Sequence, residues 1–448
     1  MMRSLRYVIT GLLLSCFTTT AWAVEQVSLN EALAASLRER PMVQAGAAEV
    51  AAAEAGVRVS SSRYLPRLSL SERFMRTDEP GGSLFASLNQ KRFELSPDAS
   101  DYNDPPARSN FETRLTLSQP LYDPDLRFER DRASLGMDAA KSAQDRHREE
   151  AALETLVAYL AVQQGHARLG WAEQSLTETE ELVAMTRTRE QNGVGLRADT
   201  LRSEVLRNES RRQLLAASNA LKSAQRRLAL AIGRDEGLVD IVDPVAIDAI
   251  ELPTVEGDNT RGDLVAMAKA VAGAELAAQQ QKAAYLPRLD LQAAYIRNDH
   301  DLGFSDRADA WSVSAGFAWL LFDGGERASA LAAARARHLA LDLQRQEQVR
   351  QVRLAVAEAW QQLEEADLQL ELVKSSLAAA EASRGLLSQR YAAGLATLSD
   401  LLAVQTELAR ARSDLAAAET GLLTARATVH YEKGSLLQAL HTESETRP

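Results

Sequence analysis

The sequence has almost no cysteine, no excess of positive charge and, after its first two dozen residues, no long apolar run. Its one cysteine, Cys16, lies near the N-terminus, so the remainder can form neither a disulfide nor a thiolate metal site. The formal charge of −11 argues against a nucleic-acid partner, which requires a basic surface. No nucleophile–base arrangement and no metal-ligand spacing is found. We therefore expect no catalytic residue, no cofactor and no metal, and a chain that is not an enzyme.

Residues 1–23 are predicted to be a signal peptide. Arg3 and Arg6 precede a short apolar stretch, and Ala21–Ala23 offers a small-residue cleavage site. The stretch is shorter than the roughly 20 residues that a membrane-spanning helix needs. A second interpretation stays open, because the residues up to Cys16 loosely resemble a lipoprotein box in which that cysteine is acylated. No later apolar run suits a membrane helix, so a mature chain that spans a membrane would do so as a β-barrel.

The sequence is internally duplicated. Tyr64–Leu70 reads YLPRLSL and Tyr285–Leu291 reads YLPRLDL, and a glycine six residues before an aspartate occurs at Gly193 and again at Gly394. Such self-similarity is typical of architectures in which equivalent units pack around an axis. The predicted segments are the signal peptide at 1–23, a first repeat at 24–233, a linker at 234–261, a second repeat at 262–433 and a polar tail at 434–448.

Each repeat contains two segments with the alternation of a half-buried strand. Leu68 and Leu70 alternate with polar residues in the first copy, as Trp311 and Val313 alternate with small residues in the second. One apolar and one polar face suit a strand between lipid and a water-filled lumen. Two ordinary amphipathic hairpins on a soluble core would fit the pattern equally well. The connection 76–109, rich in proline and glycine, is expected to be a long irregular loop.

Long helices with a coiled-coil seam follow the strands in each repeat. A helix over roughly 325–391 would span about 100 Å at about 1.5 Å per residue. Thr155 and Gly165 interrupt the corresponding seam in the first copy. In the second copy apolar residues step by three and four through both helices, for several heptads: Val352, Ala359, Leu363, Leu370 and Leu377, then Leu401, Leu408, Leu415 and Leu422.

The doubled order of strand pair, long helical hairpin and linker resembles the outer membrane efflux protein family, the TolC-like exit ducts of Gram-negative bacteria. The resemblance covers nearly the whole mature chain and includes both YLPRL segments and both hairpin turns. It implies a mixed, mainly α fold: a trimeric duct with a long antiparallel coiled-coil α-barrel and a 12-stranded transmembrane β-barrel, four strands per chain. Independently, four strands cannot close a barrel, since the smallest transmembrane barrels use eight.

The resemblance also implies a place and partners. The chain is expected to be a homotrimer in the outer membrane, in contact with its lipid and extending into the periplasm. Its tip would dock onto a periplasmic adaptor, or membrane fusion, protein fed by an inner-membrane pump of the RND, ABC or MFS type. The duct would conduct drugs, other small molecules or metals passively, because the pump supplies the energy.

Functional residues carried over by the resemblance lie at the two hairpin turns. The adaptor-docking residues are expected to be Gly193, Val194, Gly195 and Leu196 in the first turn, and Gly394 and Leu395 in the second. The channel gate is expected at Asp400, Tyr391, Asp199 and Arg197. Ala396 and Ala403 depart from the family pattern, so Arg197 is considered as a substitute cation. Either aspartate could instead cap a helix; we favour capping for Asp199 and a constricting acidic ring for Asp400.

Other functions remain as alternatives. A duct of the same fold could serve a type I protein secretion system instead of efflux. From a different class, a periplasmic coiled-coil adaptor or a structural coiled coil would also contain long helical hairpins. An adaptor usually has one hairpin, whereas here the hairpin is doubled and accompanied by four amphipathic strands.

Overall fold

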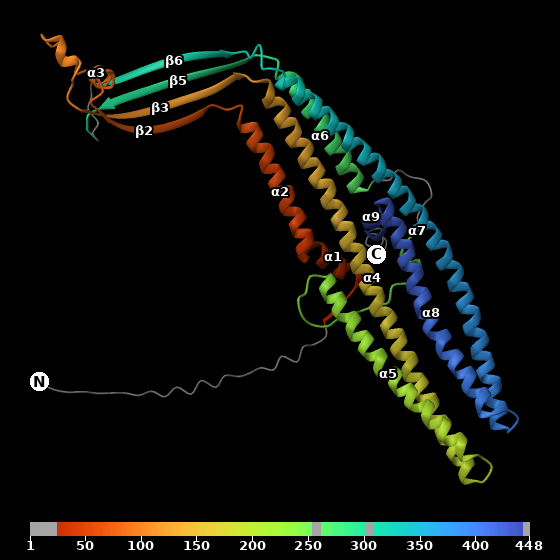
Figure 1. The fold of residues 1–448 in the computed structure, drawn as a ribbon. Helices are drawn as coiled ribbons and strands as arrows, with labels where there is room; N and C mark the ends of the chain where they lie inside the picture. Colours follow the sequence, from red (N-terminus) through yellow and green to blue (C-terminus); the bar gives the residue numbers. More distant parts are fainter. Residues whose placement is uncertain (1–24, 253–260, 302–307, 442–448) are drawn as a thin grey trace, which may run out of the picture.

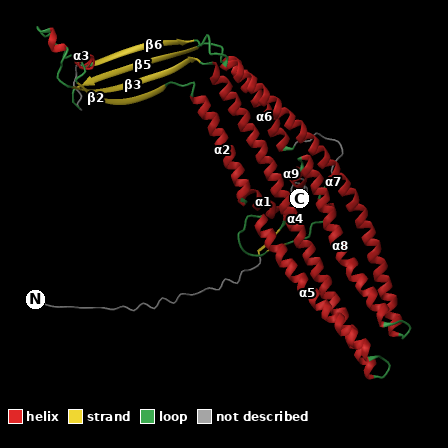
Figure 2. Ribbon diagram, viewed as in Figure 1, coloured by secondary structure: helices red, strands yellow, loops and turns green. Residues whose placement is uncertain are grey.

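The computed structural model describes residues 25–252, 261–301 and 308–441. They form an elongated molecule in which long helices run down from a four-stranded sheet at one end (Figures 1 and 2). The predicted signal peptide and Cys16 lie outside the described residues, as do parts of the predicted linker and tail. Within the described ranges, no helix is both long enough and apolar enough to cross a membrane.

One antiparallel sheet joins the strands of both repeats. Its order is β2-β3-β5-β6, so that the first repeat supplies one hairpin, the second supplies the other, and β3 pairs with β5 between them. The strands are β2 (Arg67–Thr77), β3 (Arg108–Tyr122), β5 (Arg288–Asp299) and β6 (Asp309–Ala318). The prediction of four paired strands with alternating faces is confirmed, because Leu70 lies opposite Leu115 and Ser71 lies opposite Arg114.

The connection 76–109 is more ordered than its composition suggested. It contains helix α3 (Pro80–Asn89) and a short 3₁₀ turn η1 (Ala99–Tyr102). Pro80 begins α3 instead of preventing it, since the first turn of a helix needs no N–H from that residue. At the end of α3, the Gln90 amide donates to the Asn110 side chain at 2.9 Å and fixes the helix to the end of the sheet.

The helices form a single curved layer. Beside the sheet the neighbours are α2–α4–α6–α7, and toward the far end they are α5–α4–α8–α7 (Figure 1). The bounds are α2 (Pro41–Ser62), α4 (Pro124–Gln191), α5 (Arg197–Ala231), α6 (Gly262–Ala283), α7 (Glu326–Ala392) and α8 (Leu398–Lys433). With 68 residues, α4 is about 100 Å long, as was expected for the long helices.

The heptad seam predicted for the second hairpin is buried between α7 and α8. Leu363 and Leu370 of α7 lie in one cluster with Leu422 of α8. Thr155 and Gly165, which interrupt the heptad seam of α4, both allow close contact with neighbouring helices. Thr155 donates from its hydroxyl to Ser36 at 2.8 Å, and a Cβ at Gly165 would lie 3.0 Å from Leu221 on α5.

The largest apolar core lies halfway along the molecule, where the layer thickens. Here α1 (Leu29–Glu39), α9 (Leu436–His441) and the parallel pair of β1 (Glu25–Val27) with β4 (Val239–Ile241) cover α4 and α5. Tyr159 is 1% exposed, and its hydroxyl donates to the Asp243 carbonyl at 2.7 Å. The linker is thus fixed against α4. The tail was expected to be polar, but it begins with α9, whose Leu436 is fully buried.

Candidate functional site

Both long hairpins end in the same kind of turn. Gly193 and Gly394 each have a φ of +73°, the left-handed conformation that glycine adopts without steric cost. After each glycine the next residue bonds back into the helix: the Val194 N–H donates to the Arg189 carbonyl at 3.0 Å, and the Leu395 N–H to Arg390 at 2.8 Å. This pattern is a Schellman motif, which satisfies the last carbonyls of α4 and α7.

The turns differ at their third residue. A Cβ at Gly195 would lie 2.9 Å from the backbone carbon of Arg189, so no larger residue fits without moving the turn. At the matching position in the second turn, Ala396 packs against the apolar cluster that includes Leu398 and Leu401. The first turn therefore folds tightly back onto its helix, whereas the second is anchored by side-chain packing.

Apolar side chains at both turns are exposed. Val194 is 69% exposed, Leu196 68% and Leu395 79%. The protomer does not bury these large apolar side chains. Exposed apolar surface of this kind often marks an interaction site. The predicted docking residues thus lie at the far ends of the hairpins, where a partner could reach them (Figure 1).

Asp400 is a helix-capping residue in this structure. Its carboxylate accepts hydrogen bonds from the Thr397 N–H at 3.1 Å and the Thr397 hydroxyl at 2.7 Å, and Thr397 in turn accepts from the Asp400 N–H. These bonds hold the pKa of the Asp400 carboxyl below its usual value. This reciprocal pair is a capping box, and it was the alternative that we did not favour for Asp400. Asp199 lies in the first turn of α5, whose N-cap residue makes no side-chain bond.

An arginine absent from the predicted gate ties the two hairpins together. The Arg189 guanidinium lies 4.9 Å from the centre of the Tyr391 ring, and its Nη1 donates to the Tyr391 carbonyl at 2.7 Å. Tyr391 is 5% exposed, and burial raises the pKa of its hydroxyl. Arg197, by contrast, makes no ion pair with any described residue. The structure therefore brings Arg189, and not Arg197, against Tyr391.

A second tie lies further from the turns and was not foreseen. Glu178 on α4 faces Arg412 of α8 at 3.4 Å and Arg384 of α7 at 3.7 Å. The Arg412 guanidinium also lies 4.9 Å from the Trp171 ring centre. Only 8% of the Arg412 side chain and 14% of the Glu178 side chain are exposed, so these charges meet in a low-dielectric interface.

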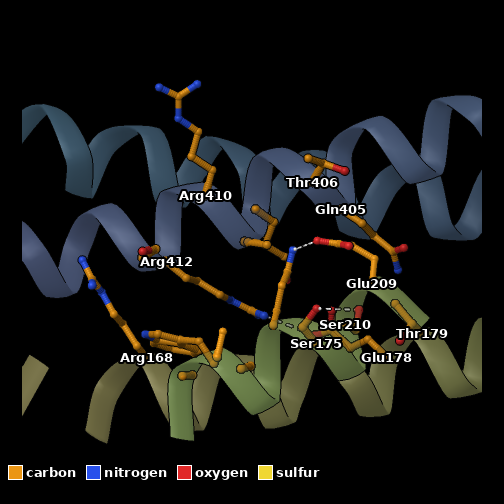
Figure 3. A pocket seen from close by; sticks show the side chains of 18 of the residues that line it. Arg168, Ser175, Glu178, Thr179, Glu209, Ser210, Gln405, Thr406, Arg410 and Arg412 are labelled. Atoms are coloured by element: carbon orange, nitrogen blue, oxygen red, sulfur yellow. Dashed lines mark hydrogen bonds and ion pairs between the residues drawn. The ribbon is translucent and has the colours of Figure 1, made fainter. Parts of the chain in front are cut away.

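A groove accompanies this cluster. Its volume is about 710 Å³, and residues of α4, α5 and α8 line it, including Ser175, Ser210 and Gln405 (Figure 3). Polar and apolar side chains both line the groove, and among the described residues no serine or threonine of the lining donates to a carboxylate or a histidine. Across the described residues, no group of three or more histidine, cysteine, aspartate or glutamate side chains could hold a metal ion. The geometry of the described residues supports contacts between the hairpins.

One protein-family model matches most of the chain. The family model described as "Outer membrane efflux protein" matches residues 32–234 and 259–430, which correspond to the two repeats. No curated protein sequence matches the chain.

Solved structures with the same fold cover nearly the whole chain. The outer membrane protein VceC from Vibrio cholerae aligns with a TM-score of 0.73 and 16% identity, over 91% of this chain and 96% of its own. A membrane protein from Pseudomonas aeruginosa aligns with a TM-score of 0.78 and 18% identity, over 92% and 93%. The CmeC outer membrane channel of Campylobacter jejuni gives 0.75 and 14%, over 95% and 94%. At these identities the likeness establishes the fold.

Replacing Glu178 with glutamine should loosen the second hairpin. The change leaves Arg384 and Arg412 without their shared counter-ion, and breaking a buried pair in this way costs up to about 3–5 kcal/mol. We expect the free energy of unfolding in detergent, followed by circular dichroism, to fall by about 3 kcal/mol. Glu180→Gln is the matched control, because Glu180 pairs with Arg211 in an exposed contact within one hairpin and should cost less than about 1 kcal/mol. An equal loss of unfolding free energy in both variants would contradict a stabilising role for the Glu178 pairs with Arg384 and Arg412.

Proposed function

The chain belongs to the outer membrane efflux protein family, and on that premise we propose that three copies form a passive exit duct across the outer membrane and the periplasm. As a member of an efflux-channel family it is a channel component and not an enzyme. The observation that carries the proposal is the exposed apolar face of the sheet. Trp311 is 75% exposed, Leu70 72% and Phe317 64%, and a surface of this kind is stable when lipid covers it.

Unpaired edges support the trimer. In the described sheet β2 and β6 each pair on one side only, so β6 of one copy can pair with β2 of the next. Three sheets of four strands would close into a ring of twelve. The helical layer also has two free edges at each level. Beside the sheet the edge helices are α2 and α7, and toward the turns they are α5 and α7. The same three-fold arrangement would close the helices into a tube continuous with the sheet.

The exposed apolar turns support docking of a periplasmic adaptor at the tip. An inner-membrane pump behind that adaptor would supply the energy, since nothing in the described residues provides a site for hydrolysis or other chemistry. The favoured process is efflux, with drugs, other small molecules or metals as the cargo, in keeping with the family description. The tip would open when the partner draws the hairpins apart at the Arg189–Tyr391 contact.

Electron microscopy of the protein extracted from the outer membrane tests the duct directly. We expect a three-fold tapered cylinder whose helical section is about 100 Å long, the length set by the helices. A monomer, or a protein recovered in the soluble periplasmic fraction, would contradict both the trimer and the membrane position. The adaptor or structural alternatives would then be preferred.

Variants at the turns test docking. Leu395→Glu places a charge on the exposed tip without altering the glycine backbone, and we expect it to abolish efflux while trimers still assemble. The readout is accumulation of a dye that also accumulates when the gene is deleted. A bulky residue at Gly195 or Gly394 should have the same effect. Leu372→Glu is the control, because Leu372 is equally apolar and 69% exposed but lies twenty residues before the end of α7. Normal efflux in all turn variants would argue against docking at the tip.

Asp400→Asn tests whether three copies of this acid form a constricting ring. Asparagine keeps an oxygen that can accept from the Thr397 N–H, so the variant removes the charge while leaving the helix cap largely in place. We expect higher single-channel conductance or weaker block by cations in planar bilayers. Asp414→Asn, on the exposed shaft of α8, serves as the control. An unchanged record for Asp400→Asn would leave the residue with its capping role alone.

A further inference from the structure

The polar face of the sheet carries an excess of arginine. The pairing register places Arg67, Arg73 and Arg108 on one face, because Arg67 lies opposite Ser118, Arg73 opposite Glu112, and Arg108 opposite Thr77. The same face continues through β5, where Asp290 lies opposite Gly316. The charged residues on this face are Arg67, Arg73, Arg108, Arg114 and Arg288, with Glu112 and Asp290 as the acids.

Few of these arginines are neutralised within the protomer. Arg114 pairs with its neighbour Glu112 at 2.8 Å, and Arg288 pairs with Asp125 at the start of α4. Arg67, Arg73 and Arg108 make no ion pair with any described residue. With the Arg288–Asp125 pair set aside, four arginines and two acids leave a net charge of +2 on the face.

The positive net charge of this face is opposite in sign to that of the other face of the sheet and of the whole chain. The other face of the sheet carries two arginines and three aspartate or glutamate residues, a net charge of −1, and the chain as a whole carries −11. The basic residues also run along the strand and do not gather at one end. Arg67 and Arg73 are six residues apart on β2, which corresponds to about 20 Å at about 3.4 Å per residue.

We propose that this arginine face lines the lumen at the sheet end of the duct and makes it favour anionic over cationic solutes. The inference rests on the proposed function, because the face encloses a lumen only when three copies close the sheet. The charge would then be three times +2. Charges of one sign on a low-dielectric wall concentrate ions of the opposite sign beside it. The favoured solutes are small molecules with carboxylate, phosphate or sulfonate groups, which arginine binds through paired hydrogen bonds.

The test is the ion selectivity of the purified protein in planar bilayers under a potassium chloride gradient. The dilute side should be about 10 mM, where the Debye length is about 30 Å and wall charges act across a wide lumen. The double variant Arg67→Gln/Arg73→Gln should lower the chloride-to-potassium permeability ratio at least about twofold relative to the parent protein. The shift should shrink as salt is raised, because screening removes the effect of the wall.

Two matched variants separate the lining from a general effect of charge. Arg76→Gln removes one arginine from the same strand but from the opposite face, and should leave the ratio unchanged. Arg73→Lys keeps the charge in place, and should retain the ratio of the parent. Permeability ratios that stay the same in the double variant, or that fall equally in Arg76→Gln, would overturn the proposal. A monomer in electron micrographs of the same preparation would instead contradict the proposed duct, so the two failures are distinguishable.

Discussion

Every part of this molecule depends on one constraint: its sheet and its helical layer each leave edges that the chain alone cannot cover. Backbone N–H and C=O groups at the free sides of β2 and β6 have no partner strand in the described sheet, and unpaired edges are costly in a medium without water. The apolar face of the sheet must also be covered, since Leu70 and Trp311 are exposed in the protomer. One strand pair from each repeat, joined through β3 and β5, covers two of the strand edges within the chain. In the proposed duct, association of copies covers the edges that remain.

A single layer of helices about 100 Å long buries little apolar surface along most of its length. The core at mid-length holds its helices together. There α1, α9 and the β1–β4 pair bury Tyr159 and Leu228 against the layer. Toward the tip the helices are held by a narrower seam and by polar ties that cross between hairpins, at Glu178 and at Arg189. The cluster of buried apolar residues near the tip is small, whereas the mid-length cluster joins many buried side chains. Apolar packing is therefore concentrated at mid-length, and the polar ties make up a larger share of the contacts toward the tip.

Much of this arrangement could be predicted from sequence, because it depends on local periodicity. Strand alternation, the heptads of α7 and α8 and the two glycine turns are all visible within a few tens of residues. The Thr397–Asp400 capping box is equally local, since a threonine three residues before an acid is a recognised helix start. The sequence therefore allowed a cap at Asp400, although the family resemblance favoured a constricting ring there. Arg189 could not be found in this way. Its partner Tyr391 is distant in the chain, and only the packing of α4 beside the second hairpin brings the two together.

The charges show why net composition is a poor guide to the lining of a duct. The chain is acidic as a whole, which keeps a long surface in the periplasm soluble, but a solute inside a closed sheet meets only the residues of one face. Register decides that face: moving β2 by a single residue would turn Arg67 and Arg73 outward and place Leu68 and Leu70 inside. The strong preference of the leucines for lipid therefore fixes the arginines inward. In a duct built this way, the same alternation that anchors the protein in the membrane also determines which charges its cargo encounters.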